Sequence, residues 1–177
     1  MTQKTKNLLL YIIIAPVLLV GCVHPTIQHQ TPTITSSVQV YFTPGTACEN
    51  NIINHINQAN KIDIAVYSIT NPQIGNAIIN AHNRGIPVRI ITDRTQSKGK
   101  KSLVNNFINA GIPLHTNKKH KIEHNKFAIF DNNYIVSGSY NWTTNASKHN
   151  SENCIFFHQP NQEFTNRFEY LWQLYSK

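Results

Sequence analysis

Acidic residues are scarce in this sequence: 8 Asp plus Glu stand against 16 Lys plus Arg, and the formal net charge is +8. A charge of this sign and size favours polyanionic partners, namely nucleic acid, anionic lipid headgroups or acidic glycans. Charge alone does not choose among the three. The chain is nevertheless 40% hydrophobic, which is typical of a globular protein and argues against a disordered or fibrous one.

Long apolar runs are missing as well. The run from Leu8 to Val20 has 13 residues and is interrupted by Pro16, whereas a membrane-spanning helix needs about 20 apolar residues. Because Lys4 and Lys6 precede this run and the small residue Gly21 follows it, the pattern predicts a signal peptide over residues 1–22. An uncleaved membrane anchor is the alternative.

The end of that run, Leu19-Val20-Gly21-Cys22, resembles a bacterial lipobox. The resemblance implies that Cys22 is lipidated, so that the protein is exported and anchored to a membrane through its lipid. Val23 in place of Asp implies the periplasmic face of the outer membrane in a Gram-negative cell. Residues 23–36 are rich in Thr, Pro, Gln and His and are expected to be a flexible linker.

Cysteine is rare in the rest of the chain, where only Cys48 and Cys154 occur. An oxidising compartment would permit them to pair, and a lone buried thiol is an equally good interpretation of either residue. Neither has a nearby histidine in an obvious nucleophile setting, so a catalytic thiol is not expected.

Residues 37–177 are predicted to form one α/β domain. The first half alternates strands and helices, which predicts a mixed, mostly parallel sheet flanked by helices on both faces. Two later strands are joined by a hairpin turn at Asp131-Asn132-Asn133, and aromatic residues at helical spacing in the last helix are expected to pack in the core. Strands are expected over 38–42, 62–68, 87–92, 114–116, 127–130, 134–137 and 154–158, and helices over 47–59, 72–84, 103–110 and 162–175.

The residues that indicate chemistry begin at His124 and Lys126. Residues two apart on a strand share a face, so one surface presents an imidazole and an ammonium group together. The loop after the next strand brings Ser139 and Asn141 beside them. A neutral imidazole nucleophile with fixed donors for phosphate oxygens is what phosphoryl transfer needs, and a carboxylate such as Glu152 is suited to orienting the imidazole.

His-x-Lys-x4-Asp, here ending at Asp131, followed by Gly-Ser-x-Asn at 138–141, resembles the signature of the phospholipase D superfamily. The resemblance covers about residues 38–177 and is greatest to the small bacterial endonuclease branch. It implies that Lys126 and Asn141 bind phosphate, Ser139 assists, Glu152 orients His124, and neither metal nor cofactor is required. Asp131 is counted with this catalytic set, although a role in supporting its loop or pairing with a cation is open.

The superfamily mechanism uses two motif histidines and a phosphohistidine intermediate. This chain has one copy of the motif and no internal repeat. The resemblance therefore implies a homodimer in which His124 of each subunit faces the other across a two-fold axis.

Two basic runs lie near this motif, one at residues 94–101 and the other at 118–121. They are either two solvated loops or the sides of a groove for a phosphate backbone. In the second interpretation the candidate substrate-binding side chains are Lys98, Lys100, Lys118 and Lys119.

Other interpretations remain open at this point. His120-Lys121-Ile122-Glu123-His124 spells H-x-x-E-H, a zinc-protease pattern that requires one helix to carry both histidines. For function, a nuclease acting on DNA or RNA is favoured. A phospholipase D acting on glycerophospholipids is the alternative, and a nucleic-acid-binding lipoprotein without activity is a third hypothesis.

Overall fold

The computed structural model describes residues 38–177. The predicted signal peptide, Cys22 and the linker at 23–36 lie outside the described residues. The elements are β1 (Val38–Phe42), α1 (Ala47–Gln58), β2 (Ile62–Val66), α2 (Pro72–Asn83), β3 (Val88–Thr92), the short 3-10 helix η1 (Gln96–Lys98), α3 (Val104–Asn109), β4 (Leu114–Thr116), β5 (Lys126–Phe130), β6 (Tyr134–Gly138), α4 (Thr144–Lys148), β7 (Asn153–Phe157) and α5 (Gln162–Ser176).

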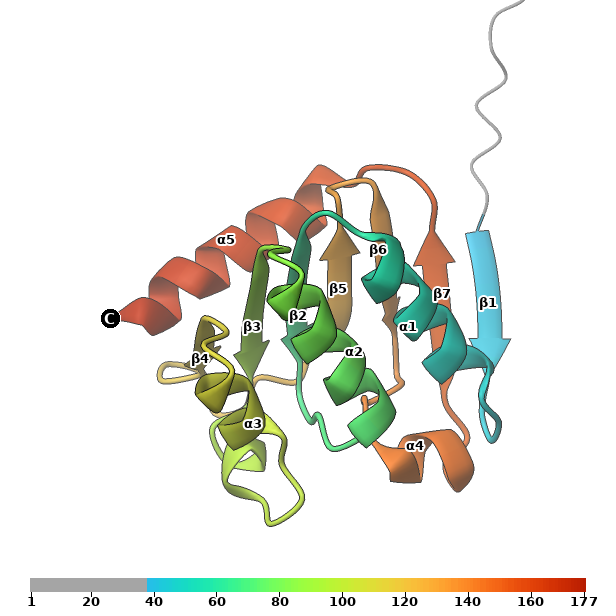
Figure 1. The fold of residues 1–177 in the computed structure, drawn as a ribbon, viewed down its shortest axis with the longest axis horizontal. Helices are drawn as coiled ribbons and strands as arrows, with labels where there is room; N and C mark the ends of the chain where they lie inside the picture. The colour runs from blue at the N-terminus through green and yellow to red at the C-terminus, as the bar shows by residue number, and fades with distance from the viewer. Residues whose placement is uncertain (1–37) are drawn as a thin grey trace, which may run out of the picture. The chain divides into compact units, whose positions relative to one another are not determined.

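The strands form one seven-stranded sheet in the order β1-β7-β6-β5-β2-β3-β4 (Figure 1). The prediction of a mostly parallel sheet is wrong: β2–β3 and β3–β4 are parallel, and the other four pairings are antiparallel. Helical crossovers keep β2, β3 and β4 parallel, whereas a tight turn can only return the chain antiparallel. Asp131 and Asn132 make that turn between β5 and β6 with φ of 54° and 59°.

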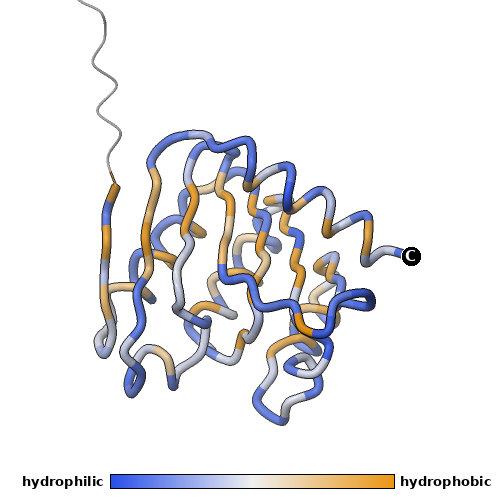
Figure 2. The backbone as a smooth tube through the Cα atoms, turned by 180° about the vertical axis from the view of Figure 1, so that it is seen from behind, coloured by the Kyte–Doolittle hydropathy of each residue, from blue (hydrophilic) through white to orange (hydrophobic). Residues whose placement is uncertain are grey.

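The expectation of helices on both faces is confirmed, because each face of the sheet carries its own hydrophobic cluster. Along β2, Ile64 and Val66 point into the larger cluster beneath α1 and α2, and Ala65 points into the smaller one beneath α5. The predicted aromatic stripe of the last helix packs in that second cluster through Phe168 and Tyr175. Figure 2 shows the apolar residues gathered along the strands and the hydrophilic ones in the connecting loops.

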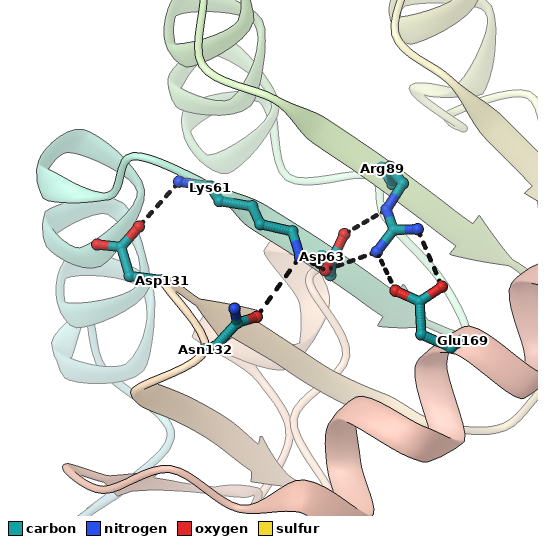
Figure 3. A network of polar contacts seen from close by, with 6 residues as sticks. All are labelled: Lys61, Asp63, Arg89, Asp131, Asn132 and Glu169. Carbon is teal, nitrogen blue, oxygen red and sulfur yellow. Dashed lines mark hydrogen bonds and ion pairs between the residues drawn. The ribbon is translucent and has the colours of Figure 1, made fainter.

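An ion-pair network fastens α5 to the sheet (Figure 3). Arg89 of β3 donates to the carboxylate of buried Asp63 on β2, at 2.6 and 2.9 Å, and to Glu169 of α5, at 2.6 and 3.2 Å. Its guanidinium also lies over the rings of Phe168 and Trp172. Arg89 therefore satisfies the buried carboxylate and at the same time aligns the helix.

Cys48 of α1 and Cys154 of β7 form a disulfide, with their Cα atoms 5.9 Å apart and a sequence separation of 106. This answers the question that the sequence left open. The bond links the first helix to the last strand. Within residues 38–177, no helix combines the length and apolar character needed to cross a bilayer.

Candidate active site

The candidate site lies at one edge of the sheet. Parallel strands β2, β3 and β4 end at this edge, and β5 begins there, because Val66 at the end of β2 pairs with Lys126 at the start of β5. β6 also ends at this edge with Gly138, which pairs with Cys154. The loops that follow or precede these strand ends therefore converge, although they are far apart in sequence.

A pocket of about 420 Å³ opens at that edge. Five of the six predicted catalytic residues line it together with one glycine: His124, Lys126, Gly138, Ser139, Asn141 and Glu152. The structure thus brings together an imidazole, an ammonium group, a hydroxyl, an amide and a carboxylate.

His124 is exposed, and its ring lies against the ring of Tyr67 with centroids 4.6 Å apart. Lys126 donates from Nζ to the carbonyl oxygen of His124 at 2.8 Å, and its ammonium lies 5.1 Å from the centre of the same tyrosine ring. Burial lowers the pKa of Lys126, and the carboxylates of Glu152 and Glu123 oppose that effect. Tyr67 therefore packs against both residues of the His-x-Lys pair.

Ser139 is fixed on the other side of the pocket. Its hydroxyl donates to Glu152 Oε2 at 2.6 Å and accepts from the backbone N–H of Asn153 at 3.1 Å. Gly138 has φ of 144°, and a Cβ at this position would collide with the oxygens of Asn153. Only glycine allows the backbone to approach so closely here.

The structure places Glu152 with Ser139 rather than with His124. Its other oxygen, Oε1, accepts from Asn150 Nδ2 at 2.9 Å, and its backbone N–H donates to Thr43 Oγ1 at 3.0 Å. Within residues 38–177 of the single chain, no hydrogen bond joins Glu152 to His124. The orientation of His124 by this carboxylate stays a prediction.

Asn141 has an unsatisfied oxygen. Its Oδ1 is buried and has no hydrogen-bond partner among the described residues. Buried polar atoms are normally paired, and Asn141 lines the pocket. The unpaired Oδ1 is an acceptor, and of the two polar atoms of this amide Nδ2 is the one that can donate to a phosphate oxygen.

The structure places Asp131 away from the other five predicted catalytic residues. Asp131 follows β5, whereas His124 precedes it, and the five residue steps from Lys126 to Asp131 span about 16 Å of strand. Its Oδ1 accepts from the backbone N–H groups of Asn60 and Lys61, at 2.7 and 2.8 Å. Asp131 supports the turn and the entry to β2 at the opposite edge of the sheet.

Three of the four candidate substrate-binding lysines come together. Lys98, Lys100 and Lys118 line a groove of about 620 Å³ that also includes His115, whose pKa is lowered by burial and by the charge of Lys118. Lys119 is exposed and does not line this groove. We call this feature the basic groove.

A chain of side-chain contacts connects the loop region of the basic groove with the pocket. Gln96, which lies in η1 together with Lys98, donates from Nε2 to the hydroxyl of Tyr67 at 2.9 Å, and the ring of Tyr67 packs against His124. The sequence did not single out Tyr67, although it lies within residues 38–177, over which the family resemblance extends. Its contribution arises from contacts that the sequence does not show.

The zinc-protease interpretation of H-x-x-E-H fails on geometry. Residues 117–125 form no helix, and Glu123 is turned inward, with 2% of its surface exposed. The two histidines therefore do not share a helical face. The described residues contain no group of three or more His, Cys, Asp or Glu side chains that could hold a metal ion.

Comparisons with known proteins agree with this geometry. Residues 52–172 match the family described as the PLD-like domain of cardiolipin synthase. The chain is 37% identical over 134 residues to a phospholipase D of Rickettsia felis, covering 74% of this chain and 67% of that protein. It is 36% identical over 116 residues to the mitochondrial cardiolipin hydrolase of Chlamydomonas reinhardtii, covering 64% of this chain and about half, 52%, of that protein.

The fold also has a solved counterpart. Nuc, a phospholipase D family member from Salmonella typhimurium, superposes with a TM-score of 0.74 at 31% sequence identity, covering 78% of this chain and 95% of that chain. The similarity therefore extends over nearly the whole of a small protein as well as over part of larger ones.

Proposed function

This chain belongs to the phospholipase D superfamily of phosphodiesterases, and on that premise we propose that it is a non-specific endonuclease that cleaves nucleic acid without a metal. The observation that carries the proposal is the pocket itself, where His124 lies beside Lys126, Ser139 and Asn141. These groups supply a nucleophile and donors for the phosphate oxygens.

The reaction would proceed in two steps. One His124 attacks phosphorus, forming a P–N bond as the P–O bond to the leaving group breaks, while the partner subunit's His124 gives the leaving oxygen its proton. That second imidazole then takes a proton from water, and the hydroxide oxygen displaces the first His124 from phosphorus. The ammonium of Lys126 and the side-chain amide of Asn141 would hold the non-bridging oxygens throughout.

The second histidine is the reason for proposing a homodimer. The described chain places one His124 in the pocket, and that residue is exposed. A two-fold axis beside it would bring two identical imidazoles to one phosphate. An exposed imidazole at the rim of the pocket is compatible with such an arrangement.

The basic groove favours a polynucleotide as substrate. Three lysines line it and no acidic residue does, and the Gln96–Tyr67 contact links it to His124. A nucleic acid carries further phosphates on both sides of the scissile one, whereas phosphatidylcholine has a single phosphate and cardiolipin only two. We assign Lys98, Lys100 and Lys118 to those neighbouring phosphates, with Lys119 at the margin.

Phospholipid hydrolysis is the second candidate. It is favoured by the names of the relatives, a phospholipase D and a cardiolipin hydrolase, and by the proposed lipid anchor at Cys22, which would hold the enzyme on a membrane. The Cys48–Cys154 disulfide supports export to the cell envelope, because disulfides persist in oxidising compartments.

The test is a comparison of plasmid nicking, RNA cleavage and phosphatidylcholine hydrolysis by the pure protein, each with and without EDTA. We expect nicking that survives EDTA and disappears in His124→Ala, while His149→Ala, an exposed histidine outside the pocket, retains it. Rapid lipid turnover with intact nucleic acid would reverse the ranking. Nucleic-acid retention without cleavage by the wild-type protein would favour a binding lipoprotein.

A further inference from the structure

A buried carboxylate lies directly behind the candidate nucleophile. Glu123 precedes His124 in sequence, and 2% of its surface is exposed. A carboxylate costs much free energy to bury unless hydrogen bonds satisfy it. Its Oε2 accepts from the hydroxyl of Tyr175 at 2.8 Å, and its Oε1 accepts from the side chain of Asn125 and from the Asn125 backbone N–H at 3.3 Å.

Tyr175 comes from the last turn of α5 and is fully buried. Its hydroxyl contacts His120 Nδ1 as well as Glu123. The C-terminal helix therefore holds the loop that leads to His124 at two points, three residues apart.

The same loop is also tied to the loop after β3. The backbone N–H of Glu123 donates to Oδ2 of Asp93 at 3.0 Å, and Asp93 is 1% exposed. The other oxygen of Asp93 accepts from the backbone N–H groups of Thr95 and Gln96, at 2.8 and 3.0 Å. One connected polar network thus fixes the base of His124 and the loop that carries Gln96.

The charge on Glu123 also bears on Lys126. Burial is the main influence on the pKa of Lys126 and lowers it, and the charges of Glu152 and Glu123 oppose this effect. The other titratable groups around Lys126 are His124 and Tyr67 beside it, and Glu163 and Arg167 of α5, which line an adjoining pocket.

We propose that Glu123 and Tyr175 are positioning residues of the His124 pocket. Tyr175 holds the Glu123 carboxylate in place, and Glu123 in turn fixes the segment from which His124 projects and supplies negative charge three residues before Lys126. Neither residue lines the His124 pocket, although Tyr175 also lines the basic groove. The inference rests on the proposed function, because positioning matters only if the pocket is catalytic. Its prediction for the pKa of Lys126 can nevertheless be tested without turnover.

Two substitutions separate the two roles. Glu123→Gln removes the charge and keeps an acceptor for Tyr175. Tyr175→Phe keeps the charge and the packing of the ring but removes one hydrogen bond. Tyr170→Phe is the matched control, because Tyr170 lies on the same helix and is 53% exposed.

Two measurements are made on each full-length protein. The pKa of the Lys126 ammonium is followed by NMR of lysine labelled with ¹⁵N at Nζ. The kcat and KM are measured with bis(p-nitrophenyl) phosphate, whose phenolate leaves without needing a proton from a catalytic acid. Thermal melting checks that each variant is folded.

We expect a lower pKa for Lys126 in Glu123→Gln than in the wild type, because one of the two opposing carboxylates is gone. In Tyr175→Phe we expect the pKa of Lys126 to stay close to the wild-type value. We expect kcat to fall by about tenfold to 100-fold and KM to change little, because the substitution disturbs the placement of His124 and not substrate binding. Tyr170→Phe should match the wild type in every measurement.

An unchanged Lys126 pKa in folded Glu123→Gln would overturn the charge role. Wild-type kcat in Tyr175→Phe, with only a lower melting temperature, would overturn the positioning role. If the wild-type protein hydrolyses no diester of any kind, the proposed function fails instead, and the NMR comparison still decides whether Glu123 governs Lys126.

Discussion

The charge of Lys126 depends on several neighbouring residues of the pocket. An ammonium that binds phosphate must be close to apolar surroundings for its charge to act strongly, yet the same burial lowers its pKa. The carbonyl of His124, the face of Tyr67 and two carboxylates compensate. The charge of Lys126 is therefore maintained by residues from several loops and not by its position in the motif alone.

Asp131 gives the first prediction, because its place in the motif and its place in the structure disagree. We expect Asp131→Ala to destabilise the protein by about 1–2 kcal/mol, since the backbone N–H groups of Asn60 and Lys61 lose a charged acceptor. The kcat of the folded variant should stay within about twofold of wild type, because Asp131 lies one strand length from His124.

Urea unfolding and diester hydrolysis, measured on the same preparation, check this prediction. A variant that unfolds like the wild type but has lost its activity would return Asp131 to the catalytic set.

At the residue scale, the sequence predicts those site members that lie close together along the chain or within one motif. Strand alternation pairs His124 with Lys126, and the glycine at 138 marks the close approach that brings Ser139 into the pocket. The contributions of Tyr67, Glu123 and Tyr175 could not be predicted, because they depend on contacts between loops and on a helical residue 52 positions away in sequence.

At the scale of elements, almost every strand and helix has the bounds that periodicity predicts to within about two residues. The exceptions are η1 and α4, which are too short to show an apolar period. The sheet was predicted less well than its strands. Alternation of strands and helices correctly indicates parallel pairing for β2, β3 and β4, but the antiparallel pairings elsewhere in the sheet are more numerous. The pairing between β1 and β7 could not be predicted, because the two strands lie at opposite ends of the domain sequence and no local pattern indicates their contact.

The docking of α5 gives an element-scale prediction about pH. Hydrogen bonding to Arg89 holds the pKa of Glu169 below its usual 4.5. A carboxylate with a depressed pKa in the folded state adds stability above its unfolded pKa and loses it as the pH falls through its folded value. We therefore expect Glu169→Gln to be less stable than wild type at pH 7 and the difference to shrink below about pH 4.

The effect should be at most about 1 kcal/mol, because the side chain of Glu169 is 42% exposed and water screens the pair. Urea unfolding of both proteins across this pH range measures it. A stability difference that grows on acidification would contradict the assigned role of the ion pair.

The two loops of the basic groove give a second prediction at this scale. Replacing Lys98, Lys100 and Lys118 with Gln should lower kcat/KM for a polynucleotide and reduce the slope of log binding constant against log salt by about 1 for each lysine. Hydrolysis of bis(p-nitrophenyl) phosphate should be unchanged, because that substrate is too small to reach the groove.

Lys148→Gln, an exposed lysine outside the groove lining, is the single-charge control. An equal loss of activity on the polynucleotide and on the small diester would indicate that the lysines act on the pocket and not on an extended strand.

At the scale of the whole molecule, the pocket is held by contacts between segments that are far apart in the sequence. The disulfide joins α1 to β7, and β7 begins directly after Glu152, whose carboxylate holds Ser139. On the other side, α5 secures the segment before His124 through Tyr175. The two walls of the pocket are thus each fixed by the C-terminal third of the chain, yet the proposed chemistry still requires an imidazole from a second copy.

That requirement gives the last prediction. Wild-type and His124→Ala chains are mixed, unfolded and refolded together so that subunits pair at random. A dimer with one imidazole lacks either its nucleophile or its acid, so only pairs of two wild-type chains turn over a substrate with a poor leaving group. Total activity should then follow the square of the wild-type fraction, and an equal mixture should have about one quarter of the activity of pure wild type at the same total protein. As the control, wild-type chains are mixed with His149→Ala chains in the same way. The total activity of these mixtures should not depend on the wild-type fraction. A straight-line dependence on the wild-type fraction would mean that each chain works alone, and the shared site would have to be abandoned.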